Sequence, residues 1–356
     1  MKTNILNEIP ENIEKVLADL LKGNVVGLPT ETVYGLAANA YNELAITKIF
    51  KAKERPHFDP LIVHHCLTDL ENPTNTIRKL HERKIIQKNL ISLKEQNIIC
   101  KLIKNFWPGP MTLILPRGPK IPDMVTSGLS TVALRHPSHP LMQKIIQKLD
   151  LPLAAPSANH FGKISPTCAE DVHKELEGKI SFILDGGPCQ HGLESTIIQI
   201  QNDKVFILRH GSLSKENLED CLDQTVYSKK AKIDENVQLK APGTLASHYS
   251  PRKKLKLIPS FLDKEILKEY KDKNVGILLF QGNQQKQKEM MKRFNSSNVL
   301  ILSEKGSLEE AARNLFKFLR ALDESNCELI ICENFSLKQG LAWAIQDRLE
   351  RASYKN

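Results

Sequence analysis

The sequence has no long apolar run, which excludes a helical membrane protein. None of its hydrophobic stretches approaches the roughly 18 residues that a spanning helix needs. The opening residues, MKTNILNEIPENIEK, contain no apolar region of the kind found in signal peptides, so we expect a cytoplasmic protein with no membrane partner. With 41% hydrophobic and 26% charged residues among 356, the composition is that of a folded globular chain.

Several chemical motifs are missing as well. The seven cysteines are scattered and form no CxxC pair, which argues against both a disulfide framework and a zinc site. No GxGxxG or GxxxxGK[ST] loop is present, and no serine stands in a GxSxG elbow. We therefore expect no metal held by protein side chains, no familiar dinucleotide or P-loop site, and no serine hydrolase.

Negative charge is in short supply. Fifty Lys and Arg against 41 Asp and Glu give a net charge of +9, which favours a polyanionic partner such as nucleotide phosphates or nucleic acid. The surplus is concentrated in segments 71–104 and 225–256, each with eight basic residues. Either segment fits a solvated face or a surface that contacts RNA, and the composition does not separate the two.

Two parts of the chain have different patterns. After residue 252, short runs rich in Val, Ile and Leu alternate with helical patterns, which predicts a small parallel, Rossmann-like α/β domain. The expected strands are 255–258, 275–280, 298–302 and 328–332. The clearest helix is 307–324, with a capping box formed by Ser307 and Glu310.

The first part predicts a mixed α/β domain. Its expected strands are 25–29, 60–65, 112–116, 131–135, 152–156, 181–185, 195–200 and 205–209. Its expected helices are 11–22, 42–53, 76–104, 139–149, 168–177 and 214–222. A polar, basic stretch with Pro242, Gly243 and Pro251 follows, so we divide the chain into a catalytic domain (1–224), a linker (225–252) and a C-terminal domain (253–356).

Polar residues cluster where the predicted strands of the first domain end. In PTETVYGL (29–36), hydroxyl groups follow a buried strand, although Thr30 or Thr32 could simply cap a helix. Lys51, Lys53 and Arg55 alternate before a proline, which fits phosphate binding but also an ordinary basic helix end.

A second set of strand ends carries a buried cation and small hydroxyl residues. Arg135 ends the strand in TVALRHP and needs an anionic partner, which is either a protein carboxylate or a ligand. The loops APSAN (155–159) and SPT (165–167) and the segment GLESTI (192–197) add small polar groups, and ILR ends at Arg209. Ligands of open α/β sheets lie at such strand ends, and this chemistry favours binding of phosphate and carboxylate.

Taken together, PTETVYGL, KAKERP, FWPGPMTLIL, TVALRHP, APSAN, SPT, GLESTI and ILR resemble the YrdC-like threonylcarbamoyl-AMP synthase family. APGTLASHY and the stretch around GLAWAIQDRLERAS are similar to the family's long, two-domain form. The resemblance implies a twisted mixed sheet with helices, followed by a smaller parallel α/β domain. It also implies a nucleotidyltransferase that combines L-threonine, bicarbonate or CO2, and ATP into threonylcarbamoyl-AMP, with release of pyrophosphate.

The same resemblance implies site residues and partners. The ATP contacts would be Arg55, Asp59, Thr131, Ser157, Ser165 and Arg209. The threonine contacts would be Thr32, His64, Arg135, Ala155 and Ser195. Mg2+ would accompany ATP, and the product would pass to the tRNA-modifying machinery that transfers threonylcarbamoyl to the adenosine next to the anticodon.

The implied chemistry needs no covalent enzyme intermediate. The threonine amine attacks CO2, and the resulting carbamate attacks the α-phosphorus as pyrophosphate leaves, so the protein must position reactants and neutralise charge. We expect Lys53 and Arg55 to stabilise that charge and Arg135 to bind the threonine carboxylate. His248 and Tyr249 end a linker that either closes over ATP as a lid or serves as a plain tether.

Two other functions fit parts of this pattern. An RNA-binding regulatory module without catalysis would use the basic segments but has no need of the polar strand ends. A related carbamoylating enzyme of hydrogenase maturation would carry zinc-finger CxxC pairs, which this chain does not have.

Overall fold

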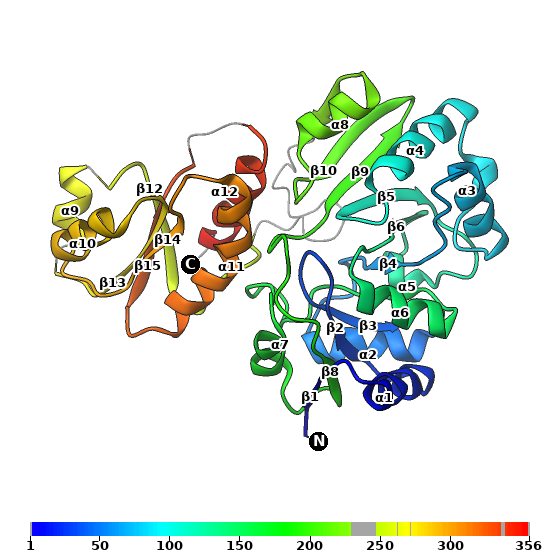
Figure 1. Ribbon diagram of the computed structural model, residues 1–356, viewed down its shortest axis with the longest axis horizontal. Coiled ribbons are helices and arrows are strands. Elements are labelled where there is room, and N and C mark those ends of the chain that lie inside the picture. The colour runs from blue at the N-terminus through cyan, green and yellow to red at the C-terminus, as the bar shows by residue number, and fades with distance from the viewer. Residues whose placement is uncertain (1, 229–246, 262, 271, 336–338, 355–356) are drawn as a thin grey trace. The chain divides into compact units, whose positions relative to one another are not determined.

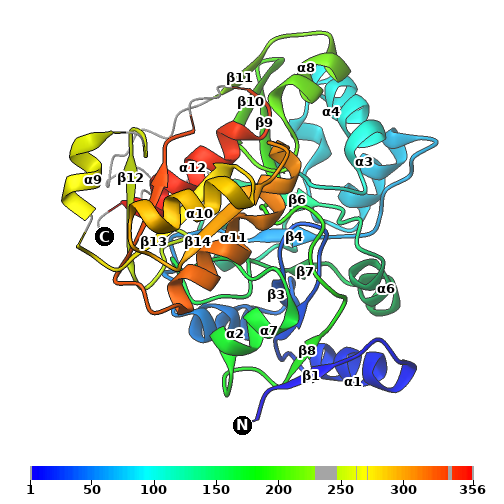
Figure 2. The same cartoon turned by 60° about the vertical axis from the view of Figure 1, so that its left-hand side comes forward.

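The structure is a computed structural model that describes residues 2–228, 247–261, 263–270, 272–335 and 339–354 (Figures 1 and 2). The chain divides into two compact units, which are described separately. The first comprises Met1–Phe161, Pro166–Gln190 and Glu194–Thr244, and the second comprises Gly162–Ser165, His191–Leu193 and Leu245–Asn356. Among the described helices, none is both long and apolar enough to cross a membrane.

A single mixed sheet runs through the first unit, and eleven strands form it in the described part of the chain. In spatial order they are β1 (Asn4–Leu6), β8 (Phe182–Leu184), β2 (Val26–Leu28), β3 (Gly35–Asn39), β7 (Leu153–Ala154), β4 (Ile62–His64), β6 (Thr131–Arg135), β5 (Met111–Pro116), β9 (Thr196–Gln201), β10 (Lys204–Arg209) and β11 (Val226–Ser228). Parallel and antiparallel neighbours both occur, which confirms the mixed sheet expected from the sequence.

Helices cover both faces of this sheet (Figure 1). One face is covered by α1 (Pro10–Leu21) and α6 (Pro140–Leu149), which bury their apolar stripes against it. The other face is covered by α2 (Glu43–Lys53), α3 (Pro73–Glu82), α4 (Leu93–Phe106), α5 (Asp123–Thr126), α7 (Ala169–Leu176) and α8 (Lys215–Leu222). Successive residues of β3 alternate between the two cores, as the pleat of a strand requires.

Two parallel neighbours in the sheet, β4 and β6, position the candidate site. Their register pairs Ile62 with Ala133 and His64 with Arg135. The carboxyl ends of both strands therefore lie side by side, and the polar residues that end them become neighbours.

The second unit has a smaller sheet in which every neighbouring pair of the described strands is parallel. The order is β12 (Lys254–Ile258), β15 (Leu329–Glu333), β13 (Val275–Gln281) and β14 (Val299–Ser303). Figure 1 shows this sheet between α9 (Lys264–Tyr270) and α10 (Gln284–Arg293) on one side and α11 (Leu308–Glu324) and α12 (Ala342–Ser353) on the other. This confirms the parallel α/β domain predicted from the alternating pattern.

Segment 76–104 is not the single helix that its pattern predicts. Helices α3 and α4 are separated by a turn in which Lys84 has a φ of 59° and by the 3-10 turn Lys88–Leu90. The Lys84 and Ile85 carbonyls instead accept hydrogen bonds from Lys120 and Gly118, so this turn packs against a distant loop. The prediction was wrong because local periodicity does not report tertiary hydrogen bonds.

Three smaller differences concern elements next to the motifs. Residues 35–39 form the strand β3 between β2 and β7, although their Gly and Ala are poor strand formers. Ser307 caps α11, but Glu310 accepts a hydrogen bond from Ser303 and does not complete a capping box. Val226–Ser228, the start of the expected linker, pairs with β10, and residues 229–246 of that linker lie outside the described residues.

Candidate active site

A buried ion pair lies where β4 and β6 end. Arg135 Nη2 lies 2.8 Å from Glu31 Oε1, and the two side chains are only 4% and 2% exposed. The Arg135 Nε also donates to the Gly109 carbonyl oxygen at 3.3 Å. The anionic partner that the sequence requires for Arg135 is therefore a protein carboxylate, before any ligand is considered.

The neighbouring His64 is neutral at physiological pH. Burial and then the charge of Arg135 lower the pKa of His64 to about 3. Burial, the largest single influence, raises the pKa of Glu31, but the Arg135 guanidinium and nearby backbone groups together hold that pKa below its usual value. This end of the two strands thus combines a neutral imidazole with a guanidinium whose charge is compensated by Glu31.

The PTET turn is organised by its first threonine. Thr30 Oγ1 lies 2.8 Å from Thr32 Oγ1 and accepts hydrogen bonds from the amides of Thr32 and Val33 at 3.2 Å. The turn therefore continues into β3 rather than capping a helix. Ala155, predicted to contact threonine through its backbone, donates its N–H to the Ile62 carbonyl oxygen at 2.9 Å, at the edge of β4.

Ser195 and Arg209 form a second buried group with Thr112. Ser195 Oγ lies 2.7 Å from Thr112 Oγ1, and Arg209 Nη2 donates to Ser195 Oγ at 3.2 Å and to its carbonyl oxygen at 2.9 Å. The next amide, that of Thr196, donates to the Pro110 carbonyl oxygen. Since Gly109 holds Arg135, the turn at 109–110 links this group to the Glu31–Arg135 pair.

Lys53 is buried and bonded to the backbone of the APSAN loop. Its Nζ donates to the carbonyl oxygens of Ser157 at 2.6 Å and Asn159 at 2.5 Å. Burial, followed by the charge of Arg55, lowers the pKa of Lys53 well below its ordinary value. In this structure Lys53 therefore fixes the loop that carries Ser157 rather than projecting a free ammonium group.

Arg55 and Asp59 form a buried ion pair of 2.8 Å, and Arg55 Nη2 also donates to the Pro60 carbonyl oxygen at 2.8 Å. The β4–β6 register places Thr131 level with Pro60, at the opposite end of β6 from Arg135. At about 3.3 Å per residue, the four steps between Thr131 and Arg135 span about 13 Å. Arg55 and Thr131 thus lie near one end of these two strands and His64 and Arg135 at the other, whereas Arg209, a predicted nucleotide contact, is bonded to Ser195, a predicted threonine contact.

Three predicted residues fall in the second unit. Ser165 is fully buried in the short stretch Gly162–Ser165. His248 and Tyr249 are also buried, and Tyr249 stacks on Phe316 with ring centroids 5.4 Å apart. The end of the expected lid is therefore packed within the second unit.

Sequence reasoning missed two residues that hold predicted ones. Glu31 lies inside the recognised PTETVYGL motif and Thr112 inside FWPGPMTLIL, so the motifs marked both without indicating a role. Their contacts with Arg135 and Ser195 join residues more than 80 positions apart. Only the folded chain could show these contacts.

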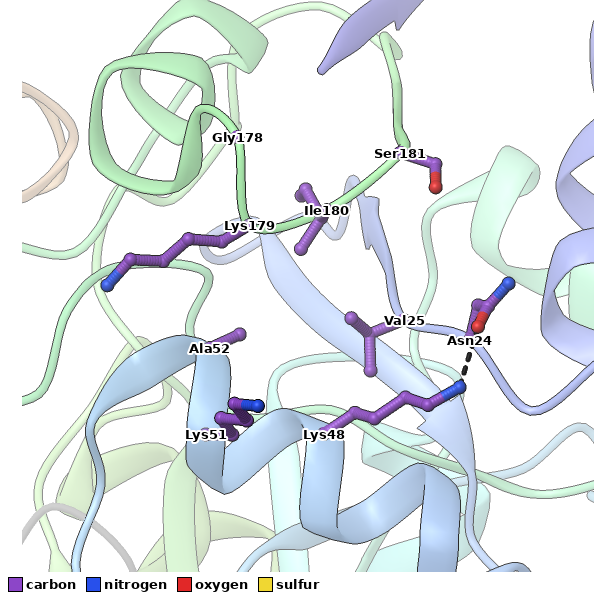
Figure 3. Close-up of a pocket in the computed structure, with 9 residues that line it drawn as sticks. All are labelled: Asn24, Val25, Lys48, Lys51, Ala52, Gly178, Lys179, Ile180 and Ser181. Atoms are coloured by element: carbon purple, nitrogen blue, oxygen red, sulfur yellow. Dashed lines mark hydrogen bonds between the residues drawn. The ribbon is translucent and has the colours of Figure 1, made fainter. Parts of the chain in front are cut away.

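A separate pocket of about 570 Å³ lies at the amino ends of β2 and β8 and is lined by Lys48, Lys51 and Lys179 (Figure 3). None of the residues that line it belongs to the predicted site. Lys48 Nζ donates to Asn24 Oδ1 at 2.7 Å and Lys179 Nζ to Glu54 Oε1 at 2.6 Å, so two of the three cations are bonded to the protein.

Comparisons with known proteins decide the family. A Sua5/YciO/YrdC family model, described as telomere recombination, matches residues 18–211, and the model of the threonylcarbamoyl-AMP synthase C-terminal domain matches residues 213–353. The chain belongs to the threonylcarbamoyl-AMP synthase family. This confirms the resemblance drawn from the motifs and the prediction of a nucleotidyltransferase.

Individual relatives cover the synthase along its whole length. The chain is 35% identical to threonylcarbamoyl-AMP synthase of Pyrococcus abyssi over 98% of this chain and 96% of that one, and 36% identical to the Bacillus subtilis protein of that name over 99% and 95%. The crystal structure of P. abyssi Sua5 complexed with L-threonine superposes with a TM-score of 0.82 at 33% identity, covering 99% of this chain and 98% of that one. Nothing in these relationships supports the alternative of a non-catalytic RNA-binding module.

A shorter relative matches little more than half of this chain. The Vibrio vulnificus threonylcarbamoyl-AMP synthase is 32% identical over 56% of this chain, and the match covers 98% of that protein.

Proposed function

We propose that this synthase joins L-threonine, CO2 or bicarbonate, and the AMP part of ATP into threonylcarbamoyl-AMP, and that the site described above performs the reaction. The observation that carries the assignment of the site is the placement of buried cations along β4 and β6. Arg55 lies near the amino end of β4 and Arg135 at the carboxyl end of β6. One pair of strands thus offers one end to a nucleotide and the other to an amino acid.

At the amino-acid end, Arg135 binds the threonine carboxylate, and the neutral His64 and Thr32 contact the remaining polar groups. A carboxylate beside a fixed guanidinium forms charge-assisted hydrogen bonds, which are stronger than neutral ones. The amine, held in place in its unprotonated form, attacks CO2, and the proton that it loses passes to solvent as the carbamate forms. Ser195 and the Ala155 backbone complete this end of the site.

At the nucleotide end, Arg55, Thr131 and Ser157 contact ATP. The family resemblance also assigns ATP contacts to Ser165 and to Arg209, which is bonded to Ser195. The carbamate oxygen attacks the α-phosphorus in line with the departing pyrophosphate, so positioning and charge neutralisation do the catalytic work. Lys53 contributes by fixing the backbone of the loop that presents Ser157. Asp59 acts through Arg55, which its carboxylate holds.

Mg2+ accompanies ATP in this proposal. The described residues include no group of three or more His, Cys, Asp or Glu arranged to hold a metal, and Asp59 is already paired with Arg55. The ligands would then be phosphate oxygens and water, which Mg2+ commonly keeps. Chelation of Mg2+ with EDTA is expected to abolish pyrophosphate release, and added MgCl2 is expected to restore it.

Four further expectations stay predictions. They are the transfer of threonylcarbamoyl to tRNA, contact of the basic segments with RNA, closure of the linker with His248 and Tyr249 over ATP, and a cytoplasmic location. The decisive experiment incubates the protein with ATP, threonine and bicarbonate and measures pyrophosphate with each component omitted. Release that requires all three supports the proposal, whereas release without threonine would contradict it. Arg55→Ala and Arg135→Ala are expected to abolish product while the circular dichroism spectrum is retained.

A further inference from the structure

The orientation of Arg135 is fixed by protein contacts. Glu31 Oε1 lies 2.8 Å from its Nη2, and the Gly109 carbonyl oxygen accepts from its Nε at 3.3 Å. Among the residues that the structure describes, none is bonded to Nη1. Two of the three guanidinium nitrogens are therefore anchored, and the third is left to a ligand.

A contribution to the stability of the fold does not explain why this buried ion pair is present. Removing both charges from water costs about as much as their attraction returns, so apolar side chains of similar size would stabilise the fold as well. Recognition of a carboxylate, in contrast, requires a guanidinium whose planar fork already points in the productive direction. The ion pair is therefore better explained by its effect on Arg135, which it holds in one orientation.

The Glu31 carboxylate is buried and charged. Arg135 and backbone groups at Glu31 and Ser138 keep the pKa of Glu31 low against the effect of burial. Glu31 belongs to the turn that Thr30 organises, and Ser138 follows the strand that ends at Arg135. The carboxylate thus ties the turn after β2 to the end of β6.

We propose that Glu31 is a positioning residue of the amino-acid subsite, which orients Arg135 so that Nη1 meets the substrate carboxylate. This inference rests on the proposed function of Arg135. Glu31 acts through Arg135 and takes no part in bond making. Its loss lets the arginine adopt other rotamers, so threonine binding weakens while the nucleotide end, at the other end of β4 and β6, is unaffected.

The test compares Glu31→Ala and Glu31→Gln with the unmodified protein. Pyrophosphate release gives KM for threonine and for ATP, and calorimetric titration with threonine measures binding without turnover. We expect Glu31→Ala to raise KM and Kd for threonine roughly tenfold or more, because the loss of one hydrogen bond to a charged group weakens binding by about this factor. KM for ATP should stay within about twofold of its value in the unmodified protein, because ATP is proposed to bind away from Glu31.

Glu31→Gln keeps an oxygen that can accept from Arg135, so we expect a smaller rise of about threefold. Formate, a small carboxylate, should restore part of the threonine affinity of Glu31→Ala by replacing the missing group. Glu8→Ala removes an exposed carboxylate that is paired with Lys144, and it serves as the control that changes neither constant.

Unchanged threonine affinity in a folded Glu31→Ala would overturn the proposal. So would an equal rise in both KM values without rescue by formate, because that result indicates general distortion. If Glu31→Ala does not fold, the threonine affinity of Glu31→Gln decides, and an unchanged value rejects the role. Should the unmodified protein bind threonine without releasing pyrophosphate, the proposed function fails while calorimetry still tests Glu31.

Discussion

Several residues of the candidate site are held by the protein before any substrate enters. Lys53 donates hydrogen bonds to two carbonyl oxygens, and Arg55 and Arg135 form ion pairs with Asp59 and Glu31. Such contacts keep buried charges in one orientation and offset part of the free-energy cost of removing those charges from water. Substitution of either residue of such a contact should therefore lower both the stability and the activity of the protein.

Lys53→Met is expected to lower the free energy of unfolding by about 3 kcal/mol, because the carbonyl oxygens of Ser157 and Asn159 lose a buried donor. Chemical denaturation monitored by circular dichroism measures the change. Lys51→Met, an exposed position on the same helix, is the matched control and should change stability by less than about 0.5 kcal/mol. Equal effects of the two substitutions would show that the backbone contacts of Lys53 contribute nothing.

His64 should make stability depend on pH. Its folded pKa is lowered to about 3 by burial, whereas the unfolded value is about 6.5. Between these values the unfolded chain binds more protons, so the free energy of unfolding falls as the pH decreases below about 6.5. This one group contributes up to about 1.4 kcal/mol per pH unit.

Urea denaturation at pH 7, 6 and 5 tests this expectation. His64→Gln cannot be protonated in that range, and its stability should fall less steeply with decreasing pH. His57→Gln, an exposed histidine, is the control and should keep the slope of the unmodified protein. Identical slopes for His64→Gln and the unmodified protein would contradict the prediction.

At the scale of elements, the connections between strands and helices place the site residues. The turn between β10 and α8 passes so close to β9 that a Cβ at Gly211 would lie 2.3 Å from the Glu194 carbonyl oxygen and 2.5 Å from the Ser195 carbonyl carbon. These are backbone atoms, which cannot move aside as a flexible side chain would. The close approach therefore fixes the backbone that carries Ser195.

Gly211→Ala should push this backbone apart. We expect a loss of about 2 kcal/mol in the free energy of unfolding, as for an overpacked core, together with a higher KM for threonine. Gly282→Ala, at the end of β13, is the control, since its Cβ would meet only side-chain atoms, the nearest of which is Lys286 Cδ at 3.0 Å. A Gly211→Ala protein as stable and active as Gly282→Ala would show that the turn is free to shift.

At the scale of the whole molecule, the contribution of the second domain is open to a direct test. The first unit is compact by itself and ends its sheet with β11, so we expect a chain ending at Ser228 to fold. If residues 225–252 close over ATP, the shortened chain should make less threonylcarbamoyl-AMP, because water then reaches the labile adenylate.

The measurement is the yield of adenylate per pyrophosphate released, with circular dichroism as the check on folding. A folded, shortened chain with unchanged yield would reject the lid and leave the linker as a tether. The structure already shows Tyr249 stacked on Phe316, which belongs to the second unit. Closure over a nucleotide would therefore need this contact to break or to move with the unit.

Much of the fold could be predicted because its elements have strong local patterns. The short apolar runs of the second unit are strands, and the helix that begins after Ser307 lies where the apolar spacing indicates. The single helix predicted over 76–104 was wrong because distant hydrogen bonds shape the turn at Lys84, and the Gly- and Ala-rich strand β3 was not predicted at all. Neither feature has a signal within a few residues.

Motifs and local periodicity were enough to predict the family, the two-domain organisation and the residue types of the candidate site. The partners of those residues could be identified only in the folded chain. Segments that are far apart in the chain are joined by three contacts. These are the contacts of Glu31 with Arg135, of Thr112 with Ser195, and of Lys53 with carbonyl oxygens. Such contacts follow from strand order and register, which arise when the whole sheet assembles and which no local stretch of sequence contains.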